Sequence, residues 1–342
     1  MKFPFSSSSS ISFSDTHVRF VRFKRSWNEV SLKDFEGYEL TRGIIEGGKI
    51  KDDEQLVKIL KNLKKRQGIK SVRVSLPEDE THLFIMNIER KRIGRMHYRN
   101  LRKFVQFSFK KYTNIPKEDV VFEIKILSKN EKFFEIQVAL MDRKVLARYF
   151  NIFKKAGITV KSFEPEGVSL MHSLVAKKDK RALMIVNVEY SRAGVFVVYG
   201  NAILFTSTID FGDKSIFDMF EEKIEKNSFV LTKNMVVANT ASGAFSGFHL
   251  LKEEISKYFL YWHTRGGEEG KERPAIKEII LCGEGAKISG LSEYLAVSLK
   301  TPVSLANVWV NVLDPSKEIP SLTYTESLSF AQPIGASIRE FK

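Results

Sequence analysis

Two stretches of this 342-residue chain have the same order of predicted secondary structure, and this repeat constrains the fold more than any other feature. In the first stretch, apolar residues alternate around the basic Arg19 and Arg22, which is typical of strands. A helix with an acidic start and a basic end follows, and then a strand that Pro77 closes. The predicted elements are strands at 11–13, 18–23 and 30–35, a helix at 52–66 and a strand at 71–76.

The second half repeats the order strand, strand, strand, helix, strand, with more helical content before its last strand. Gly200-Asn201 provides a two-residue hairpin turn between two of these strands. The predicted elements are strands at 183–188, 194–199 and 202–209, helical segments between 213 and 265, a strand at 278–282 and a helix at 291–299. Two copies of one unit predict two similar lobes that face each other across a cleft. Chance similarity is the alternative, because three strands followed by a helix is a common order.

Between the two copies lies an insert over residues 81–162. Its strands alternate well, so one face of its sheet is expected to pack on its helices. The predicted elements are a strand at 83–88, a helix at 98–112, strands at 120–127 and 133–141, a helix at 143–156 and a strand at 159–163. Gly157 stands where a left-handed residue ends a helix. The insert is therefore predicted to be a small α+β module.

The insert also carries most of the net positive charge of the chain. Between residues 90 and 111 there are nine Lys or Arg residues and no Asp or Glu, whereas the net charge of the whole chain is +14. Such a local concentration is expected of a surface that faces anionic lipid, nucleic acid or an acidic partner. The equally weighted alternative is a solvated basic helix face with no partner. The candidate residues for a partner or lipid surface are Arg92, Arg95, Arg99, Arg102 and Lys103.

Aromatic residues accompany this basic run, so binding of single-stranded nucleic acid is a further hypothesis. However, Phe104 with Phe107, and Tyr98 with Leu101 and Val105, fall at helical spacings of three or four. That spacing is typical of a stripe that faces a core. Core packing is therefore the favoured interpretation, and nucleic acid is an unlikely partner.

The composition sets outer limits on the kind of protein. Apolar residues make up 43% of the chain and aromatic residues 12%, which is too much core material for a disordered chain. The single cysteine, Cys282, excludes an intrachain disulfide and favours the cytoplasm. No apolar run approaches the roughly 20 residues that span a bilayer, and the six histidines have no metal-site spacing. Residues 1–10, with five consecutive serines, are predicted to be a flexible tail.

Several collinear segments resemble a known family. They are residues 145–157, 163–170, the stretch Ile279-Ile280-Leu281-Cys282-Gly283-Glu284-Gly285-Ala286-Lys287 that continues to residue 295, and the ending Phe330-Ala331-Gln332-Pro333-Ile334-Gly335 up to residue 339. Together with the order of elements, they resemble the actin-like PilM family of type IV pilus assembly proteins, relatives of the cell-division protein FtsA. The resemblance implies an α/β fold of two duplicated, ribonuclease H-like lobes with an inserted SHS2-type subdomain.

On that resemblance the chain divides into the following parts. The first lobe would contain residues 11–80, 163–180 and 326–342, and the inserted subdomain residues 81–162. The second lobe would contain residues 181–325, with a helical subdomain at about 213–275.

The resemblance also implies a nucleotide site in which two hairpins present phosphate loops, each with an aspartate that holds magnesium or orients water. In this chain Ser12 and Asn187 stand at the two aspartate positions, and Ser14 and Glu189 stand at glycine positions. The glycines that remain as candidates are Gly212, Gly283 and Gly285. A carboxylate beside phosphates is repulsive by about 4 kcal/mol at 4 Å and a dielectric near 20. The site is therefore predicted to be degenerate, with no cofactor and no metal.

The function that the resemblance implies is that of a non-catalytic cytoplasmic scaffold in a type IV pilus or type II secretion machine, peripheral to the inner membrane. Its partner would be the short cytoplasmic N-terminus of a single-span, PilN-like membrane protein, held in a groove beside the insert. The basic helix differs from the more acidic pattern expected there, so it would instead touch anionic headgroups. The alternatives are an ATPase that binds ATP and magnesium, and a nucleic-acid-binding protein. Self-association remains open.

Overall fold

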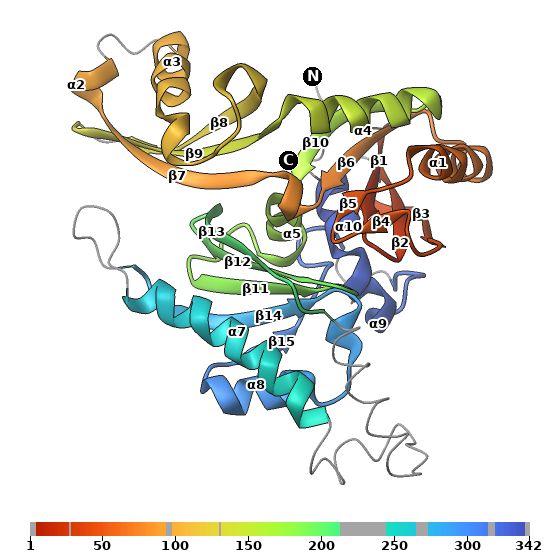
Figure 1. The fold of residues 1–342 in the computed structure, drawn as a ribbon. Helices are drawn as coiled ribbons and strands as arrows, with labels where there is room; N and C mark the ends of the chain where they lie inside the picture. Colours follow the sequence, from red (N-terminus) through yellow and green to blue (C-terminus); the bar gives the residue numbers. More distant parts are fainter. Residues whose placement is uncertain are drawn as a thin grey trace.

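Two five-stranded sheets with the same topology form the framework of the chain (Figure 1). The computed structural model describes residues 5–26, 29–93, 98–129, 131–212, 244–264, 273–313 and 319–338. In each sheet, the first three strands pair antiparallel as a meander. Two further strands lie on the free side of the first strand and run parallel to it. The predicted duplication is therefore confirmed.

The first sheet has the order β10-β6-β1-β2-β3 and the second the order β13-β12-β11-β14-β15. The strands of the first sheet are β1 (Phe5–Phe13), β2 (His17–Ser26), β3 (Glu29–Glu39), β6 (Ser71–Leu76) and β10 (Thr159–Pro165). Those of the second are β11 (Ala182–Val188), β12 (Ala193–Tyr199), β13 (Ala202–Ile209), β14 (Ile276–Cys282) and β15 (Val303–Leu305). A short hairpin of β4 (Ile45–Glu46) and β5 (Lys49–Ile50) follows β3.

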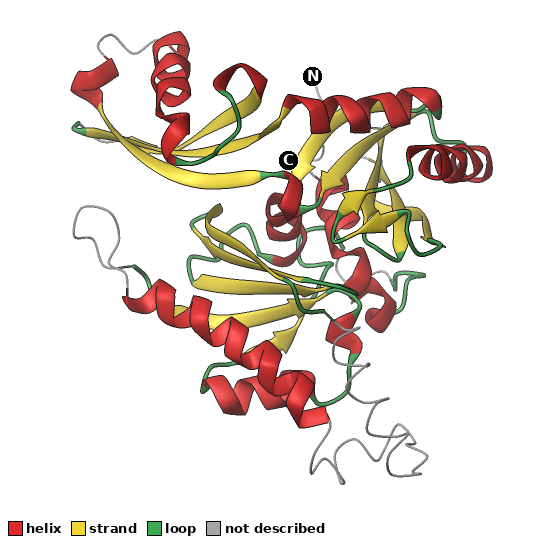
Figure 2. Ribbon diagram, viewed as in Figure 1, coloured by secondary structure: helices red, strands yellow, loops and turns green. Residues whose placement is uncertain are grey.

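Helices cover both sheets and fill the space between them (Figure 2). Helices α1 (Asp53–Gln67) and α4 (Arg143–Lys155) belong to the first sheet, and α7 (Ala244–Thr264) and α8 (Leu291–Leu299) to the second. Helices α5 (Glu166–Leu174) and α10 (Ala331–Ile338) pack against each other between the sheets. The short helix α9 (Tyr324–Ser327) precedes α10 in the chain. Of the predicted helical subdomain, residues 213–243 and 265–272 lie outside the described residues.

Helix α1 illustrates how local sequence signals set an element. The Asp52 side chain accepts a hydrogen bond from the Gln55 amide at 2.9 Å, which caps the N-terminus. Gly68 ends the helix with a φ of 59°, a left-handed conformation that glycine adopts without strain. The buried side chains of one face, Leu56, Ile59, Leu60 and Leu63, join the core of the first sheet.

The flexible tail predicted over residues 1–10 is wrong for the residues that the structure describes. Residues 5–10 form the first half of β1, which lies between β2 and β6, and Ser8 and Ser10 are completely buried. The Ser10 hydroxyl donates to the Pro333 carbonyl, and the Ser337 hydroxyl donates to the Ser8 carbonyl at 2.9 Å. Small side chains allow α10 to lie against this strand, a contact between the two ends of the chain that no local pattern reveals.

The insert is smaller than the predicted range of 81–162. Strand β10 pairs with β6 of the first sheet, and Tyr149 and Phe153 of α4 share a core with Leu60. Both elements therefore belong to the first lobe. The sequence pattern of an amphipathic helix followed by a strand does not distinguish a place in the lobe from a place in the insert. The insert itself consists of β7 (His82–Glu89), α2 (Arg90–Ile93), α3 (Tyr98–Ser108), β8 (Val120–Lys129) and β9 (Phe133–Asp142).

The three strands of the insert form an antiparallel sheet of order β7-β9-β8, with α3 packed on one face. On the other side, the Gln137 side chain donates to the Ile203 carbonyl and Lys125 to the Asn201 carbonyl, each at 2.8 Å. These contacts join the insert to the β12–β13 hairpin of the second sheet. The insert is thus placed against both lobes.

The crossing of α5 and α10 depends on a glycine. A Cβ atom on Gly335 would lie 1.7 Å from the Ser169 carbonyl oxygen, a distance that no side chain can occupy. We expect Gly335→Ala to push these two helices apart and to lower the free energy of unfolding by about 1–3 kcal/mol. Urea denaturation measures this change.

The matched control is Gly37→Ala, because a Cβ there meets only ordinary contacts at 3.6 Å and beyond. It should cost less than Gly335→Ala. Equal effects of the two substitutions would contradict a tight α5–α10 crossing.

Candidate functional site

The β1–β2 turn of the first sheet contacts the β11–β12 turn of the second sheet. Asp15, in the β1–β2 turn, accepts a hydrogen bond from the hydroxyl of Ser191, in the β11–β12 turn. The same carboxylate accepts the backbone amides of Gly47 and Gly48, both at 2.9 Å. Asp15 therefore joins the two hairpins and the β4–β5 turn through its own oxygens.

Arg19 of β2 links the first lobe to the second. Its side chain is 2% exposed, and its guanidinium lies 2.6 Å from the Glu284 carboxylate and 3.6 Å from that of Glu189. It also donates to the Ser14 hydroxyl at 3.2 Å. Glu284 is in turn bound by Lys287 at 2.6 Å. A cation from one lobe is thus enclosed by two carboxylates of the other.

Arg192 makes the reciprocal link, from the second lobe to the first. Its guanidinium binds Asp79, which follows β6, and the buried Glu166 at the start of α5, at 3.2 Å. The other Glu166 oxygen accepts the Asn187 amide at 2.7 Å. Arg192 therefore holds together the C-terminal ends of β6 and β11 and the N-terminus of α5.

These contacts shift the pKa values of the carboxyl groups in opposite directions. Burial raises the pKa of Glu189 to about 7, although the nearby Arg19 opposes the shift. Burial and the neighbouring Glu166 raise the pKa of Glu78 to about 8. Burial would also raise the pKa of Glu284, but Arg19 and Lys287 outweigh it and lower that pKa to about 2.

Most of the residues predicted for the degenerate nucleotide site lie around these links. Ser12 is buried and is the register partner of Arg19, while Asn187 also accepts the Cys282 thiol at 3.4 Å. A Cβ on Gly212 would lie 2.2 Å from the Glu189 carbonyl oxygen, and one on Gly283 would lie 2.3 Å from that of Val188. Gly285 is buried at the start of a short 3₁₀ turn, residues Gly285–Lys287. Their role toward a nucleotide stays a prediction.

The central residues, Arg19 and Arg192, were not among the predicted site residues. The alternation of β2 gave no sign of this role for Arg19, whose buried side chain reaches two carboxylates of the second lobe. The sequence signal that could have indicated these arginines was the pair of acids Glu189 and Glu284, which stand in loops that the resemblance places in the same site. Acids that are buried together need cations.

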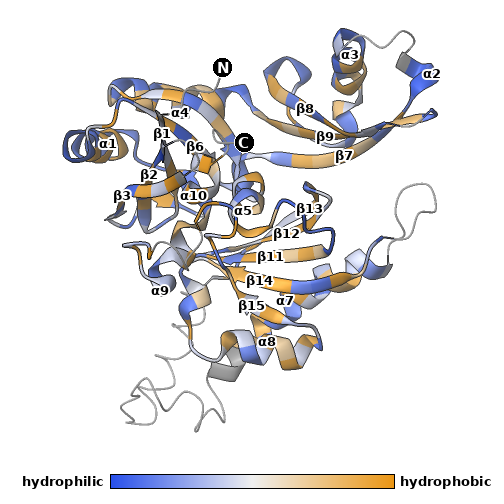
Figure 3. Ribbon diagram, turned by 180° about the vertical axis from the view of Figure 1, so that it is seen from behind, coloured by the Kyte–Doolittle hydropathy of each residue, from blue (hydrophilic) through white to orange (hydrophobic). Residues whose placement is uncertain are grey.

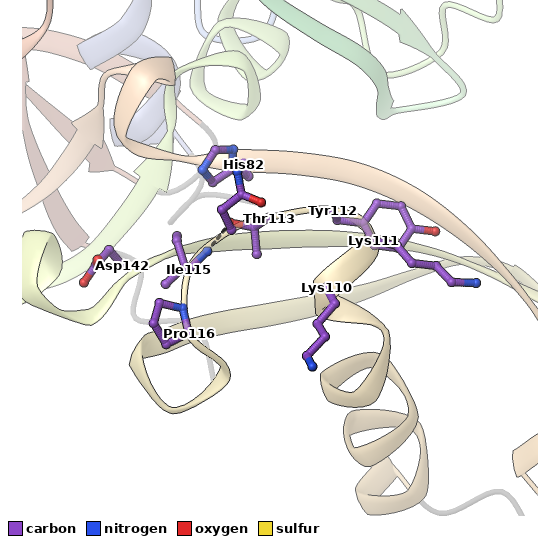
Figure 4. A pocket seen from close by; sticks show the side chains of 9 residues that line it. His82, Lys110, Lys111, Tyr112, Thr113, Ile115, Pro116 and Asp142 are labelled. Carbon is purple, nitrogen blue, oxygen red and sulfur yellow. Dashed lines mark hydrogen bonds between the residues drawn. The ribbon is translucent and has the colours of Figure 1, made fainter.

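Two hollows border the insert and meet at its first strand. One is lined by His82, Lys110 and Lys111, by the loop of residues 112–116 and by Asp142 at the start of α4 (Figure 4). The other lies between β7 and β13 and is lined by Glu78, Thr81, Phe84 and residues 206–208 among others. His82 and Tyr112 line both, and the Tyr112 ring stacks on Phe84 with centroids 4.0 Å apart. We call the two hollows together the insert groove.

The predicted basic surface is only partly assembled. Arg99 and Lys103 are exposed on one face of α3, whereas Arg92 lies 3.5 Å from Glu89 and Arg102 lies over the Phe122 ring at 4.2 Å. Arg95 lies outside the described residues. The buried stripe of α3 is Leu101 and Val105, continued by Phe109, while Phe107 is 75% exposed and Tyr98 51% exposed. The prediction that Phe107 and Tyr98 face the core was therefore wrong.

The family model of the type IV pilus assembly protein PilM matches residues 10–341. The chain belongs to the PilM family. Among solved structures, the PilM-PilN type IV pilus biogenesis complex has a TM-score of 0.77 at 16% identity, covering 98% of this chain and 98% of that chain. The ethanolamine utilization protein EutJ from Carboxydothermus hydrogenoformans has a TM-score of 0.55 at 10% identity, covering 99% and 91%. No curated protein sequence matches significantly.

These likenesses show an actin-like α/β fold, as the resemblance implied. The residues that this PilM-family chain places between its lobes do not fit magnesium-bound ATP. Ser12 and Asn187 offer no carboxylate for the cation, and both polar ends of the Asn187 amide are already bonded. Both arginines are engaged by carboxylates, and the buried Glu189 adds a group that repels phosphate.

Among the described residues of this PilM-family chain, no helix has the length and apolar character of a bilayer span. Nor does that part of the chain contain three or more His, Cys, Asp or Glu side chains arranged to hold a metal ion.

The raised pKa of Glu189 predicts a pH-dependent stability. Because the folded state binds this proton more tightly than the unfolded state, the contribution of Glu189 to stability falls as the pH rises from about 4.5 to about 7. Glu189→Gln removes this titration. We expect the free energy of unfolding of the variant, relative to the wild type, to increase between pH 5 and pH 8 in urea denaturation.

Glu326→Gln is the control. The Thr323 side chain lowers the pKa of Glu326, so this group stays ionised over the same pH range. Its effect on stability should therefore be independent of pH. A constant difference between Glu189→Gln and the wild type would show that Glu189 is ionised throughout.

Proposed function

We propose that this PilM-family protein is a cytoplasmic scaffold of a type IV pilus or related type II secretion platform, peripheral to the inner membrane. Its partner is the cytoplasmic N-terminus of a PilN-like membrane protein, and it acts without hydrolysing ATP. Family membership and the likeness to a PilM-PilN complex support the pilus role and the partner. The observation that carries the absence of hydrolysis is the Arg19 link to Glu189 and Glu284.

The insert groove is the proposed peptide site. It lies between β7 and β13, which are edge strands of their sheets. An edge strand offers backbone groups to an extended peptide, and neighbouring hollows accept its alternate side chains. The apolar surfaces of Tyr112, Ile115 and Pro116 would contact the peptide, with Lys110 and Lys111 at the rim.

The ion pairs between the lobes favour a scaffold over an ATPase because they connect the two lobes, as a nucleotide bound between the lobes would do. In this protein, carboxylate and guanidinium groups connect the lobes directly. A phosphate chain would have to displace Arg19 from two carboxylates and lie beside both of them. Breaking a buried ion pair costs about 3–5 kcal/mol, which opposes nucleotide entry.

Binding of the partner peptide is tested with a synthetic peptide of the cytoplasmic N-terminal segment of the PilN-like protein from the same organism. Tyr112→Ala removes the ring shared by both parts of the groove, and Ser207→Arg fills the part next to β13. We expect each to raise the dissociation constant roughly tenfold or more in calorimetric titration, as loss of an aromatic anchor does.

Tyr324→Ala is the matched control, because Tyr324 is half exposed and does not line the groove. It should bind the peptide like the wild type, and melting curves should show that all variants fold. Unchanged affinity in both groove variants would place the peptide elsewhere.

The absence of hydrolysis is tested separately, against the alternative of an actin-like ATPase. A ligand that binds the folded state raises the melting temperature. We expect millimolar ATP with magnesium to leave the melting temperature unchanged within error, and phosphate release to equal that of a protein-free sample. A rise that requires both ATP and magnesium would support the ATPase instead.

A further inference from the structure

Helix α3 has two faces of different character. Leu101 and Val105 pack on the sheet of the insert, whereas Arg99, Lys103 and Phe107 follow one another on the opposite side at spacings of four residues. Lys110, three residues further on in the 3₁₀ turn Phe109–Lys111, continues this side. All four are exposed, and Phe107 is the most exposed aromatic ring among the described residues. We call these four residues the basic face.

The charges of the basic face have no ion-pair partner among the described residues. Two other cations of the insert do have partners, since Lys91 lies 3.0 Å from Glu89 and Arg102 lies 4.0 Å from Glu123. Within the described residues, no carboxylate lies within ion-pair distance of Arg99, Lys103 or Lys110. A concentration of unpaired positive charge attracts an anionic partner.

Phe107 distinguishes among anionic partners. Proteins that bind single-stranded nucleic acid offer successive rings with free faces for the bases. Here one face of the Phe107 ring is covered by the Lys117 ammonium, 3.9 Å from the ring centroid, and Phe109 is buried. A single apolar ring surrounded by cations is instead typical of helices that lie in the headgroup region of a membrane.

The position of the basic face agrees with a membrane surface. Helices α2 and α3 lie on the side of the insert sheet that is turned away from the second lobe (Figures 1 and 3). Lys110 belongs both to the basic face and to the lining of the insert groove. A peptide that emerges from a bilayer and enters the groove would therefore bring the basic face close to the lipid.

We propose that the basic face binds anionic phospholipid headgroups, with Phe107 inserted among them, while the groove holds the partner peptide. The membrane context rests on the proposed function, but the lipid contact itself is a property of α3. Lipid and peptide would then bind at adjacent sites, and the two contacts together would orient the molecule on the membrane.

The experiment is co-sedimentation of the full chain with phosphatidylcholine vesicles, with or without phosphatidylglycerol. We expect the wild type to bind only the anionic vesicles. Each basic residue near an anionic surface contributes about a fivefold factor, so the double variant Arg99→Glu, Lys103→Glu should weaken binding on the order of 30-fold or more. Phe107→Ala should also weaken it, and the tryptophan emission of Phe107→Trp should shift to the blue with anionic vesicles only.

The matched control is Lys61→Glu with Lys65→Glu on α1, where two exposed lysines have the same spacing of four residues. It changes the net charge equally, so it should retain binding if the contact is specific to α3. Equal losses in the two double variants, or equal binding of neutral and anionic vesicles, would refute the proposal. Binding of a single-stranded oligonucleotide without vesicle binding would also refute it.

The peptide titration is repeated on the Arg99→Glu, Lys103→Glu variant, which leaves Lys110 and the groove intact. Loss of lipid binding with unchanged peptide affinity is the expected result. If the wild type itself does not bind the peptide but still binds anionic vesicles through α3, the proposed function fails and the lipid site stands.

Discussion

A buried guanidinium is the constraint on which the arrangement of the lobes depends. Arg19 has almost no contact with solvent, and because a guanidinium stays charged, its burial is tolerated only where carboxylates compensate the charge. Its partners Glu189 and Glu284 come from turns at the ends of two strands, β11 and β14, of the other sheet. Because both turns must reach the same side chain, the relative position of the two sheets is defined at this point.

Arg192 of the second lobe makes the equivalent interaction in the opposite direction, with Asp79 and Glu166. The pair of arginines therefore forms two links that run in opposite directions, and Asp15 lies between them with its bonds to Ser191 and the β4–β5 turn. Buried pairs of this kind are screened by salt much less than surface pairs. The groove beside the insert is bordered by β13 of the second lobe and by β7 of the insert, which follows directly after the Asp79 segment that Arg192 binds. A constant angle between the lobes would keep the groove preformed, which lowers the entropic penalty of peptide binding.

The local elements of this fold could be predicted from the sequence, because their signals are local. Strands β6 and β13 and helix α8 begin and end at the predicted residues, and α1 differs by one residue at each end. The errors concern contacts between distant residues. Serines have neither apolar periodicity nor strand propensity, so residues 5–10 of β1 were predicted as a tail. Their burial depends on pairing with β2 and on contacts with Pro333 and Ser337 at the far end of the chain.

For the candidate site too, residues in local motifs could be predicted from the sequence, whereas their partners from distant parts of the chain could not. The resemblance singled out Ser12, Asn187 and Glu189, which lie around the interlobe links, but it did not reveal the cations that balance the buried Glu189. Arg19 follows the alternation of an ordinary surface strand, and nothing near it in the chain shows that the other face of β2 meets a second lobe. The insert boundary was misplaced for a similar reason, because parallel pairing of β10 with β6 joins residues that are far apart in sequence.

The distribution of charge separates two regions that could otherwise compete for anions. Between the lobes, the acids Asp15, Asp79, Glu166, Glu189 and Glu284 outnumber the bases Arg19, Arg192 and Lys287, and those bases are already paired. On the insert, exposed cations of α3 have no such partners among the described residues. This distribution favours the approach of an anionic molecule to the insert rather than to the space between the lobes. In this PilM-family chain, ion pairs connect the lobes, and the two proposed recognition surfaces lie at the inserted subdomain.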